Sequence, residues 1–178
     1  MVAILAAEGH KIRSHIFNVF KGIPKDVQSF GILFNMQKIK IDTVINADIK
    51  KVWEHWNNTE SIKGWAFASN TWECPYAEND LRAGGRFLTR MSAKDGSDTF
   101  DFTGTYTDVV EYKSIKYLMD KADDENQQRE CEITFTDLSD GTTKIEEEFS
   151  PEEINSEEMQ RAGWAGILEN FKQFVSNH

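Results

Sequence analysis

The sequence predicts an α+β domain in which an antiparallel β-sheet is covered by a long C-terminal helix. Strand patterns joined by short turns follow one another between residues 86 and 149, and patterns of helical period flank them on both sides. Runs of hairpin-linked strands with helices at either end are typical of this fold class. The chain has 178 residues, of which 39% are hydrophobic, so it is long enough for one globular domain of common size.

The first part of the domain is predicted to be a strand followed by two helices. Polar and apolar residues alternate in Lys38–Ile45, which indicates a half-buried strand. Asn46 is a suitable helix N-cap, and the residues behind it form an apolar stripe at helical spacing: Ile49, Val52, Trp53 and Trp56. Thr59 is expected to cap a short second helix that ends at Trp65. Thr71–Glu73 is then predicted as a short strand or an extended loop.

The middle of the chain is predicted to be a series of antiparallel strands. Asp-Gly pairs in Lys94–Ser97 and Ser139–Gly141 suit the positive φ angles of hairpin turns. Lys121–Gln128, with its acids at Asp123–Glu125, is predicted as a polar loop. The segments between these turns are rich in aromatic and β-branched residues and are expected to be strands: Arg86–Ala93, Thr99–Glu111, Ser114–Met119, Arg129–Leu138 and Thr142–Phe149.

A long helix is predicted over Ser156–Ser176, and its apolar stripe is wide enough to cover one face of the sheet. Gly163 and Gly166 lie inside it, where each glycine costs about 0.8–1.0 kcal/mol relative to alanine. Two interpretations account for these small residues. Either the helix approaches the sheet closely there, or the glycines leave space for a bound molecule.

Composition excludes several classes of function. There are 30 acidic and 20 basic side chains, a net charge of −10, which argues against a nucleic-acid partner. No apolar run approaches 18 residues, so no membrane span is expected. Cys74 and Cys131 are too few for a disulfide framework, and the four histidines lack zinc-ligand spacing. No metal or cofactor is therefore expected, and without a recognisable secretory signal the cytoplasm is the default location.

Residues 1–35 differ from the rest of the chain because their basic side chains outnumber their acidic ones. Ile12, Ile16, Val19 and Phe20 recur at helical spacing among basic residues, which is compatible with a basic amphipathic helix at an anionic surface. The other interpretation is an extension outside the fold, with the natural protein starting at Met36. We expect the folded domain to comprise residues 36–178.

Strand alternation identifies candidate side chains for chemistry. Ile145 and Phe149 place Glu147 on an apolar face, where burial would raise the pKa of its carboxyl group. The other interpretation places Glu147 near the rim or beside a base such as Arg161. Tyr106 and Cys131 are expected on inward faces too, as polar groups in a cavity or simply as core.

The tryptophans divide into two groups. Trp53 and Trp56, three residues apart on a helix, are expected in the core. Trp65, Phe67 and Trp72 lie around a loop and are better candidates for the lid of a cavity.

Several separated blocks of the chain resemble the START/Bet v 1-like (SRPBCC) superfamily, and more narrowly proteins similar to the C-terminal domain of the activator of Hsp90 ATPase. The resemblance covers about residues 36–178 and is carried by these segments: Ile45–Glu54, Trp65–Ser69, Trp72–Pro75, Glu78–Arg82, Gly84–Phe87, Asp101–Tyr106, Glu158–Trp164 and Leu168–Phe171. It implies a helix-grip fold, in which a curved antiparallel sheet wraps around the C-terminal helix and encloses an apolar cavity. The segment Ala83–Arg86 does not match the glycine-rich loop of plant members.

The resemblance implies that the domain binds a small apolar or amphipathic molecule between the sheet and the C-terminal helix, without necessarily being an enzyme. The residues expected to contact it are Trp65, Phe67, Trp72, Phe87, Phe102, Tyr106, Cys131, Phe135, Glu147, Gly163 and Ile167. A polyketide cyclase or dehydratase is the alternative, with Glu147 and Tyr106 as its polar groups. An Hsp90-stimulating module is a further alternative. The 35 residues before the domain are too few for the chaperone-binding domain of true activators, so a chaperone partner is not expected.

Overall fold

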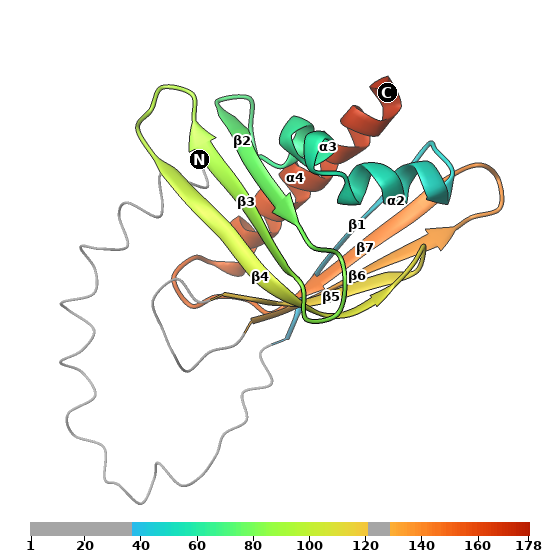
Figure 1. Cartoon of the computed structure of the whole chain (residues 1–178). Coiled ribbons are helices and arrows are strands. Elements are labelled where there is room, and N and C mark those ends of the chain that lie inside the picture. The colour runs from blue at the N-terminus through green and yellow to red at the C-terminus, as the bar shows by residue number, and fades with distance from the viewer. Residues whose placement is uncertain (1–36, 121–128) are drawn as a thin grey trace, which may run out of the picture.

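The computed structural model describes residues 37–120 and 129–178, and in them one curled antiparallel sheet wraps around a long helix (Figure 1). The seven strands lie in the order β1-β7-β6-β5-β4-β3-β2. Their bounds are β1 Ile39–Ile45, β2 Trp72–Asn79, β3 Arg86–Ala93, β4 Thr99–Val110, β5 Ser114–Met119, β6 Arg129–Asp137 and β7 Thr143–Phe149. The described helices are α2 Ile49–Asn57, α3 Thr59–Trp65 and α4 Glu157–Asn177.

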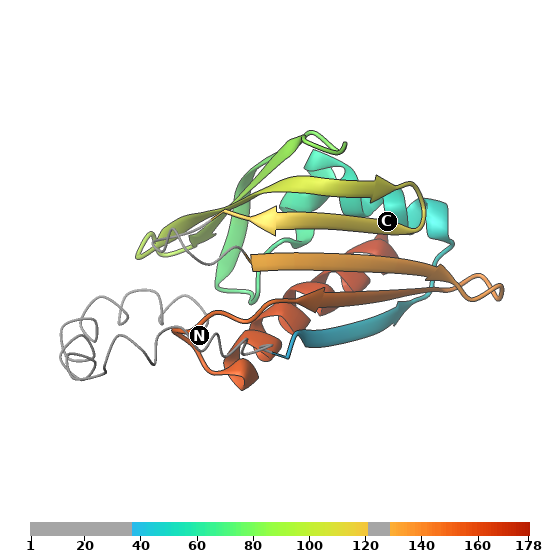
Figure 2. The same ribbon diagram turned by 90° about the horizontal axis from the view of Figure 1, so that it is seen from below.

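The predicted fold class is confirmed. Every pair of neighbouring strands is antiparallel, and the sheet is a half-barrel whose concave face receives α4, as in a helix-grip fold. Figure 2 shows α4 running beneath β7 and β1, while β2, β3 and β4 bend away from it. The two interpretations of residues 1–35 and the predicted loop 121–128 lie outside the described residues.

Two helix caps differ from the predicted ones by one or two positions. Asp48, and not Asn46, is the N-cap of α2, because its Oδ1 accepts hydrogen bonds from the backbone N–H groups of Lys50 and Lys51 at 3.0 and 3.1 Å. Asn58 caps α3 in the same way, so that Thr59 becomes the first residue of the helix. A sequence with several cap-forming residues in a row does not say which of them has the extended backbone that a cap requires.

Strand β2 is longer than the short strand or loop predicted at 71–73. It continues through Pro75 to Asn79, with a register shift between Glu73 and Tyr76. Proline cannot donate a ladder hydrogen bond, so it is tolerated on an edge strand and at a bulge. β2 is an edge of the sheet, and the bulge lies at Pro75.

Helix α4 packs against the β1 edge of the sheet. Leu168, Phe171 and Val175 of α4 are fully buried there. One turn before them, the Trp164 ring stacks on Phe149 of β7, with ring centroids 4.0 Å apart and planes at 14°. The N-terminus of the helix is capped by Ser156, whose Oγ accepts a hydrogen bond from the backbone N–H group of Met159.

Helices α2 and α3 close one end of the half-barrel (Figure 1). Trp53 of α2 is buried against the edge of the Phe135 ring, at a centroid distance of 5.1 Å. The buried Thr143 hydroxyl donates a hydrogen bond to the carbonyl oxygen of Ala47 at 2.9 Å, which ties the start of β7 to the turn before α2. The predicted core position of Trp53 is therefore observed.

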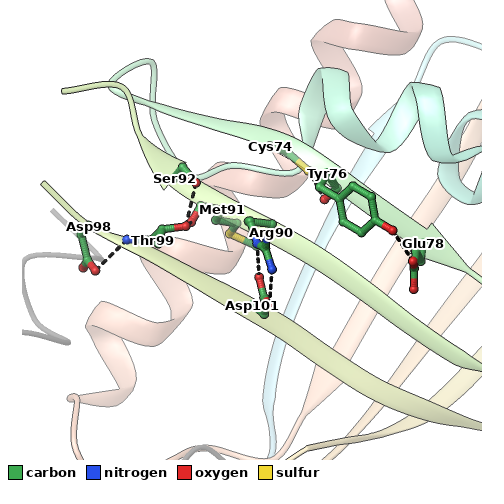
Figure 3. Close-up of polar contacts among 9 residues, drawn as sticks. All are labelled: Cys74, Tyr76, Glu78, Arg90, Met91, Ser92, Asp98, Thr99 and Asp101. Atoms are coloured by element: carbon green, nitrogen blue, oxygen red, sulfur yellow. Dashed lines mark hydrogen bonds and ion pairs between the residues drawn. The ribbon is translucent and has the colours of Figure 1, made fainter. Parts of the chain in front are cut away.

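The convex face of the sheet is polar. On β3 and β4, Arg90 donates two hydrogen bonds to the Asp101 carboxylate at 2.6 and 2.7 Å, and its guanidinium lies 5.9 Å from the centre of the Tyr76 ring (Figure 3). Asp101 thus points outward, as the strand alternation predicted. In the described parts of the chain, no helix is long and apolar enough to cross a lipid bilayer.

We expect Phe171→Ala to lower the free energy of unfolding by about 3–5 kcal/mol, because it removes a fully buried ring at the centre of the contact between α4 and the sheet. Val110→Ala, at a side chain that is 40% exposed, is the control and should cost about 0.5 kcal/mol or less. Urea unfolding measures both. Equal costs for the two substitutions would show that α4 does not anchor the core.

Candidate functional site

A cavity of about 550 Å³ lies between the concave face of the sheet and helices α3 and α4. Its size is within the range of small-molecule sites, and most of its wall is apolar. The aromatic side chains of this wall come from helices and strands alike: Trp56, Trp65, Trp72, Phe87, Phe100, Phe102, Tyr106, Tyr117 and Trp164.

The structure brings together most of the predicted ligand-contacting residues. Those that line the cavity are Trp65, Trp72, Phe87, Phe102, Tyr106, Glu147, Gly163 and Ile167. They come from three regions that are distant in sequence, namely α3 with β2, the β3–β4 hairpin, and β7 with α4. The pairing of the strands and the position of α4 bring these three regions together around the cavity.

Three predicted residues do not line the cavity. Phe135 lies against the Trp53 and Trp56 rings at centroid distances of 5.1 and 5.6 Å and belongs to the packing between α2 and β6. Cys131 is 1% exposed and lies beside Tyr117, so the cavity wall there is the tyrosine. Phe67 is half-buried, and its carbonyl oxygen accepts a hydrogen bond from Asn170 of α4 at 2.5 Å.

The two helix glycines divide between the two interpretations. Gly163 lines the cavity. Gly166 does not, and a Cβ atom there would lie 3.0 Å from the carbonyl oxygen of Ala68, in the segment between α3 and β2. Gly166 therefore allows α4 to approach this segment closely, whereas the prediction was a close approach to the sheet.

Tyr106 has a satisfied hydroxyl group. It donates a hydrogen bond to Asn79 Oδ1 at 2.7 Å, and Asn79 Nδ2 in turn donates to the carbonyl oxygen of Asn57 at 2.7 Å. Burial raises the pKa of the Tyr106 phenol above its ordinary value, so the phenol stays protonated at physiological pH. It can still accept a hydrogen bond from a molecule in the cavity.

Glu147 is the exceptional polar group of the cavity. It lies on β7 opposite Ile133 of β6 and Ile41 of β1, and only 5% of it is exposed. It has no hydrogen bond or ion pair with any residue of 37–120 or 129–178. Burial raises the pKa of its carboxyl group to about 8, because an ionised carboxylate loses its hydration there and gains no partner.

The alternative position predicted for Glu147, at the rim or beside Arg161, is not observed. Arg161 is on the exposed side of α4, and its guanidinium donates a hydrogen bond to the carbonyl oxygen of Lys40. The β7 strand keeps its alternation without a bulge in its pairing with β6, so the inward position follows directly from the register.

Gln160 and Arg129 are polar groups of the wall that have hydrogen-bond partners. The side chain of Gln160 donates to the carbonyl oxygens of Glu152 and Asn155 and accepts from the Glu152 backbone N–H group, all at 2.8–3.0 Å. It thereby holds the segment between β7 and α4 against the helix. Arg129 donates to the carbonyl oxygen of Ser150 at 3.1 Å, and burial lowers the pKa of its guanidinium.

Sequence reasoning missed several residues of the wall. Tyr117 shares an inward face with Ile115 and Met119, and Thr89 shares one with Phe87 and Met91. The same alternation that identified Glu147 would have found both. Gln160 and Trp164 could be placed only when the rotation of α4 about its axis was known. Among the described residues, no group of three or more histidine, cysteine, aspartate or glutamate side chains is placed to hold a metal ion.

Residues 46–176 match the family model described as activator of Hsp90 ATPase homolog 1-like protein. This match lies within the predicted domain and leaves the first 45 residues outside it. No curated protein matches the chain.

Solved structures include two clear relatives. An AHSA1-like protein from Aeromonas hydrophila is 38% identical, with 78% of this chain and 93% of that one covered and a TM-score of 0.68. A protein from Cytophaga hutchinsonii is 43% identical, with coverages of 79% and 92% and a TM-score of 0.65. A Nitrosomonas europaea protein, at 18% identity, coverages of 80% and 96% and a TM-score of 0.64, shares the fold.

The position of Glu147 predicts a pH dependence of stability. Its pKa is near 4.5 in an unfolded chain and about 8 in the fold, so between these values the folded protein holds a proton that the unfolded chain has lost. The stabilisation that comes from holding this proton is therefore lost as the pH rises from 4.5 to about 8. Glu147→Gln cannot ionise, and its stability relative to the wild type should rise by about 1.4 kcal/mol per pH unit.

Urea unfolding at pH 5, 6, 7 and 8 measures this difference. Glu148→Gln, on the outward face of the same strand, reports the effect of removing one carboxyl group from the surface. A constant difference between wild type and Glu147→Gln across the four pH values would contradict the buried position.

Proposed function

The chain belongs to the activator of Hsp90 ATPase homolog 1-like family, and on this premise we propose that it binds a small apolar or amphipathic molecule in the cavity between the sheet and α4. The resemblance predicted from the sequence is thereby confirmed. The single observation that carries the proposal is the largely apolar cavity of about 550 Å³ between the sheet and helices α3 and α4.

The packing around the cavity supports this proposal. Protein interiors are normally filled to the density of organic crystals, so a large apolar space is costly to keep empty. Phe149, Phe171 and Ile145 are fully buried on the adjoining side, where the same sheet and helix meet without such a space. The cavity is therefore confined to one half of the interface, as expected for a site that holds a molecule.

The test is uptake of a neutral apolar fluorophore, N-phenyl-1-naphthylamine, by the full chain. Thr89 lines the cavity and Leu88 points to the other face of β3. We expect Thr89→Phe to fill part of the cavity and weaken binding by at least tenfold, while Leu88→Phe leaves the affinity within about twofold of wild type. Fluorescence titration measures both, with circular dichroism as the control for folding.

Absence of fluorophore binding by the wild type would overturn the proposal. Equal loss in both variants would also overturn it, because the fluorophore would then be binding elsewhere.

A second candidate function, an acid–base enzyme of the cyclase or dehydratase type, is favoured by Glu147. A carboxyl group whose pKa is about 8 is close to the operating pH at which general acid–base catalysis is efficient. In a dehydration of a β-hydroxycarbonyl compound, the Glu147 carboxyl group would give its proton to the hydroxyl group, which leaves as water as its C–O bond breaks. The resulting carboxylate would take the α-proton, so that the C=C bond forms and the carboxyl group is regenerated.

The measurement for this second candidate is water loss from an aromatic β-hydroxyketone, followed by the absorbance of the conjugated product. Wild-type turnover with a loss of at least 100-fold in Glu147→Gln is the expected result. Equal rates with and without the protein would exclude dehydration of this substrate class.

A further inference from the structure

We propose that the cavity selects amphipathic molecules that carry a cationic amine, with the ammonium group paired to the Glu147 carboxylate and surrounded by aromatic rings. This inference rests on the proposed binding function and names the class of ligand. It follows from three features of the described wall: a buried acid without a partner, an aromatic surround, and the absence of a net positive charge among the other charged side chains.

The first feature is the unpaired carboxyl group of Glu147. Two other buried polar side chains of the wall have partners: Tyr106 donates to Asn79, and Gln160 makes three hydrogen bonds. Glu147 is 5% exposed and has no partner among the described residues. A buried carboxylate is stable only when an opposite charge or hydrogen-bond donors compensate its lost hydration. An ammonium group in the cavity would provide both.

The second feature is the aromatic wall. The rings of Tyr117 of β5 and Phe87 of β3, the strands on either side of β4, have centroids 5.0 Å apart, and Trp164 faces Phe102 edge-on at 5.9 Å. Trp164 itself stacks on Phe149, the residue two positions after Glu147 on β7. The negative faces of aromatic rings attract cations most strongly where water is excluded. The rings thus favour the charged head of an amine as well as its apolar body.

The third feature is the charge of the other titratable groups that face the cavity. Glu152 of the segment before α4 and Arg129 of β6 are charged residues of the described wall, whereas the Glu78 carboxylate accepts a hydrogen bond from the Tyr76 hydroxyl on the convex face (Figure 3). The lining residues contributed by α3 and α4 carry no charge. The charges of Glu152 and Arg129 are opposite, so they leave no net positive charge in this described part of the wall to compensate the Glu147 carboxylate.

The remaining titratable groups near Glu147 are neutral. Burial raises the pKa values of the Tyr117 phenol and the Cys131 thiol well above their ordinary values. The whole chain, with a net charge of −10, adds a field that attracts cations and repels fatty-acid-like anions.

Amine binding has a thermodynamic signature that a neutral ligand lacks. In the free protein near pH 7 the Glu147 carboxyl group is mostly protonated, because its pKa is about 8. An ammonium ion stabilises the carboxylate, so the carboxyl proton passes to the buffer when the ion pair forms. Near pH 7 each binding event should release close to one proton, and the release should vanish well above pH 8.

The experiment is isothermal titration calorimetry of the full chain at pH 7 with 4-phenylbutylamine and its matched alcohol, 4-phenylbutan-1-ol. Titrations in buffers of different ionisation enthalpy give the number of protons released. We expect the amine to bind at least tenfold more tightly than the alcohol and to release close to one proton, and the alcohol to release none.

Glu147→Gln preserves the shape of the side chain and should remove both the preference for the amine and the proton release, while the alcohol still binds. Glu148→Gln is the matched control, because it makes the same change at the next residue on the outward face. It should keep the amine preference and the proton release of the wild type.

The outcomes separate this inference from the proposed function. If the alcohol binds as tightly as the amine, or if the wild type releases no proton, the amine assignment is wrong and the binding function stands. Tighter binding of 4-phenylbutanoate than of the amine would overturn it in favour of Arg129 as the head-group contact. If no probe binds, including the neutral fluorophore, the binding function fails and the amine assignment with it.

Discussion

The structure depends on one constraint: the concave face of a strongly curled sheet is apolar, and a single long helix has to cover it. α4 lies close to the β1 edge, where Phe171 and Val175 are fully buried. Its backbone is farther from β3, β4 and β5, because these strands curl away (Figures 1 and 2). A straight helix cannot follow a curved sheet along its whole width, so the same contact that makes the core on one side leaves the cavity on the other.

Large aromatic side chains extend into the space between α4 and strands β3, β4 and β5. Phe87, for example, extends from β3 across Gly104 of β4, and a Cβ atom at Gly104 would lie 2.6 Å from both the Phe87 ring and the carbonyl oxygen of Leu118. The glycine therefore lets the ring lie flat against the neighbouring strand. Rings reach far into the space without filling it, which gives the cavity an aromatic wall and an apolar interior.

Glu147 connects stability to function in this arrangement. An alternating strand that contributes Ile145 and Phe149 to the core must place the residue between them on the same face. A hydrophobic side chain there would stabilise the fold at neutral pH, whereas the carboxyl group destabilises it when it ionises. A residue that lowers the stability of the fold in this way is typical of a binding or catalytic position, because function there is gained at the expense of stability.

The sequence by itself determined the order and type of the elements and the inward faces of β4, β6 and β7, and it left Glu147 either on the apolar face or at the rim. These depend on local alternation, helical period and turn chemistry, which can be observed within a few neighbouring residues. It did not determine the cap at Asp48 or the continuation of β2 through Pro75, because several local solutions were equally possible. Only the tertiary structure decided that Gly163 lines the cavity while Gly166 meets Ala68, and that Cys131 and Phe135 lie behind its wall. The physical reason is that the curvature of the sheet and the rotation of α4 result from packing between residues far apart in the chain, and the cavity is the space left by that packing.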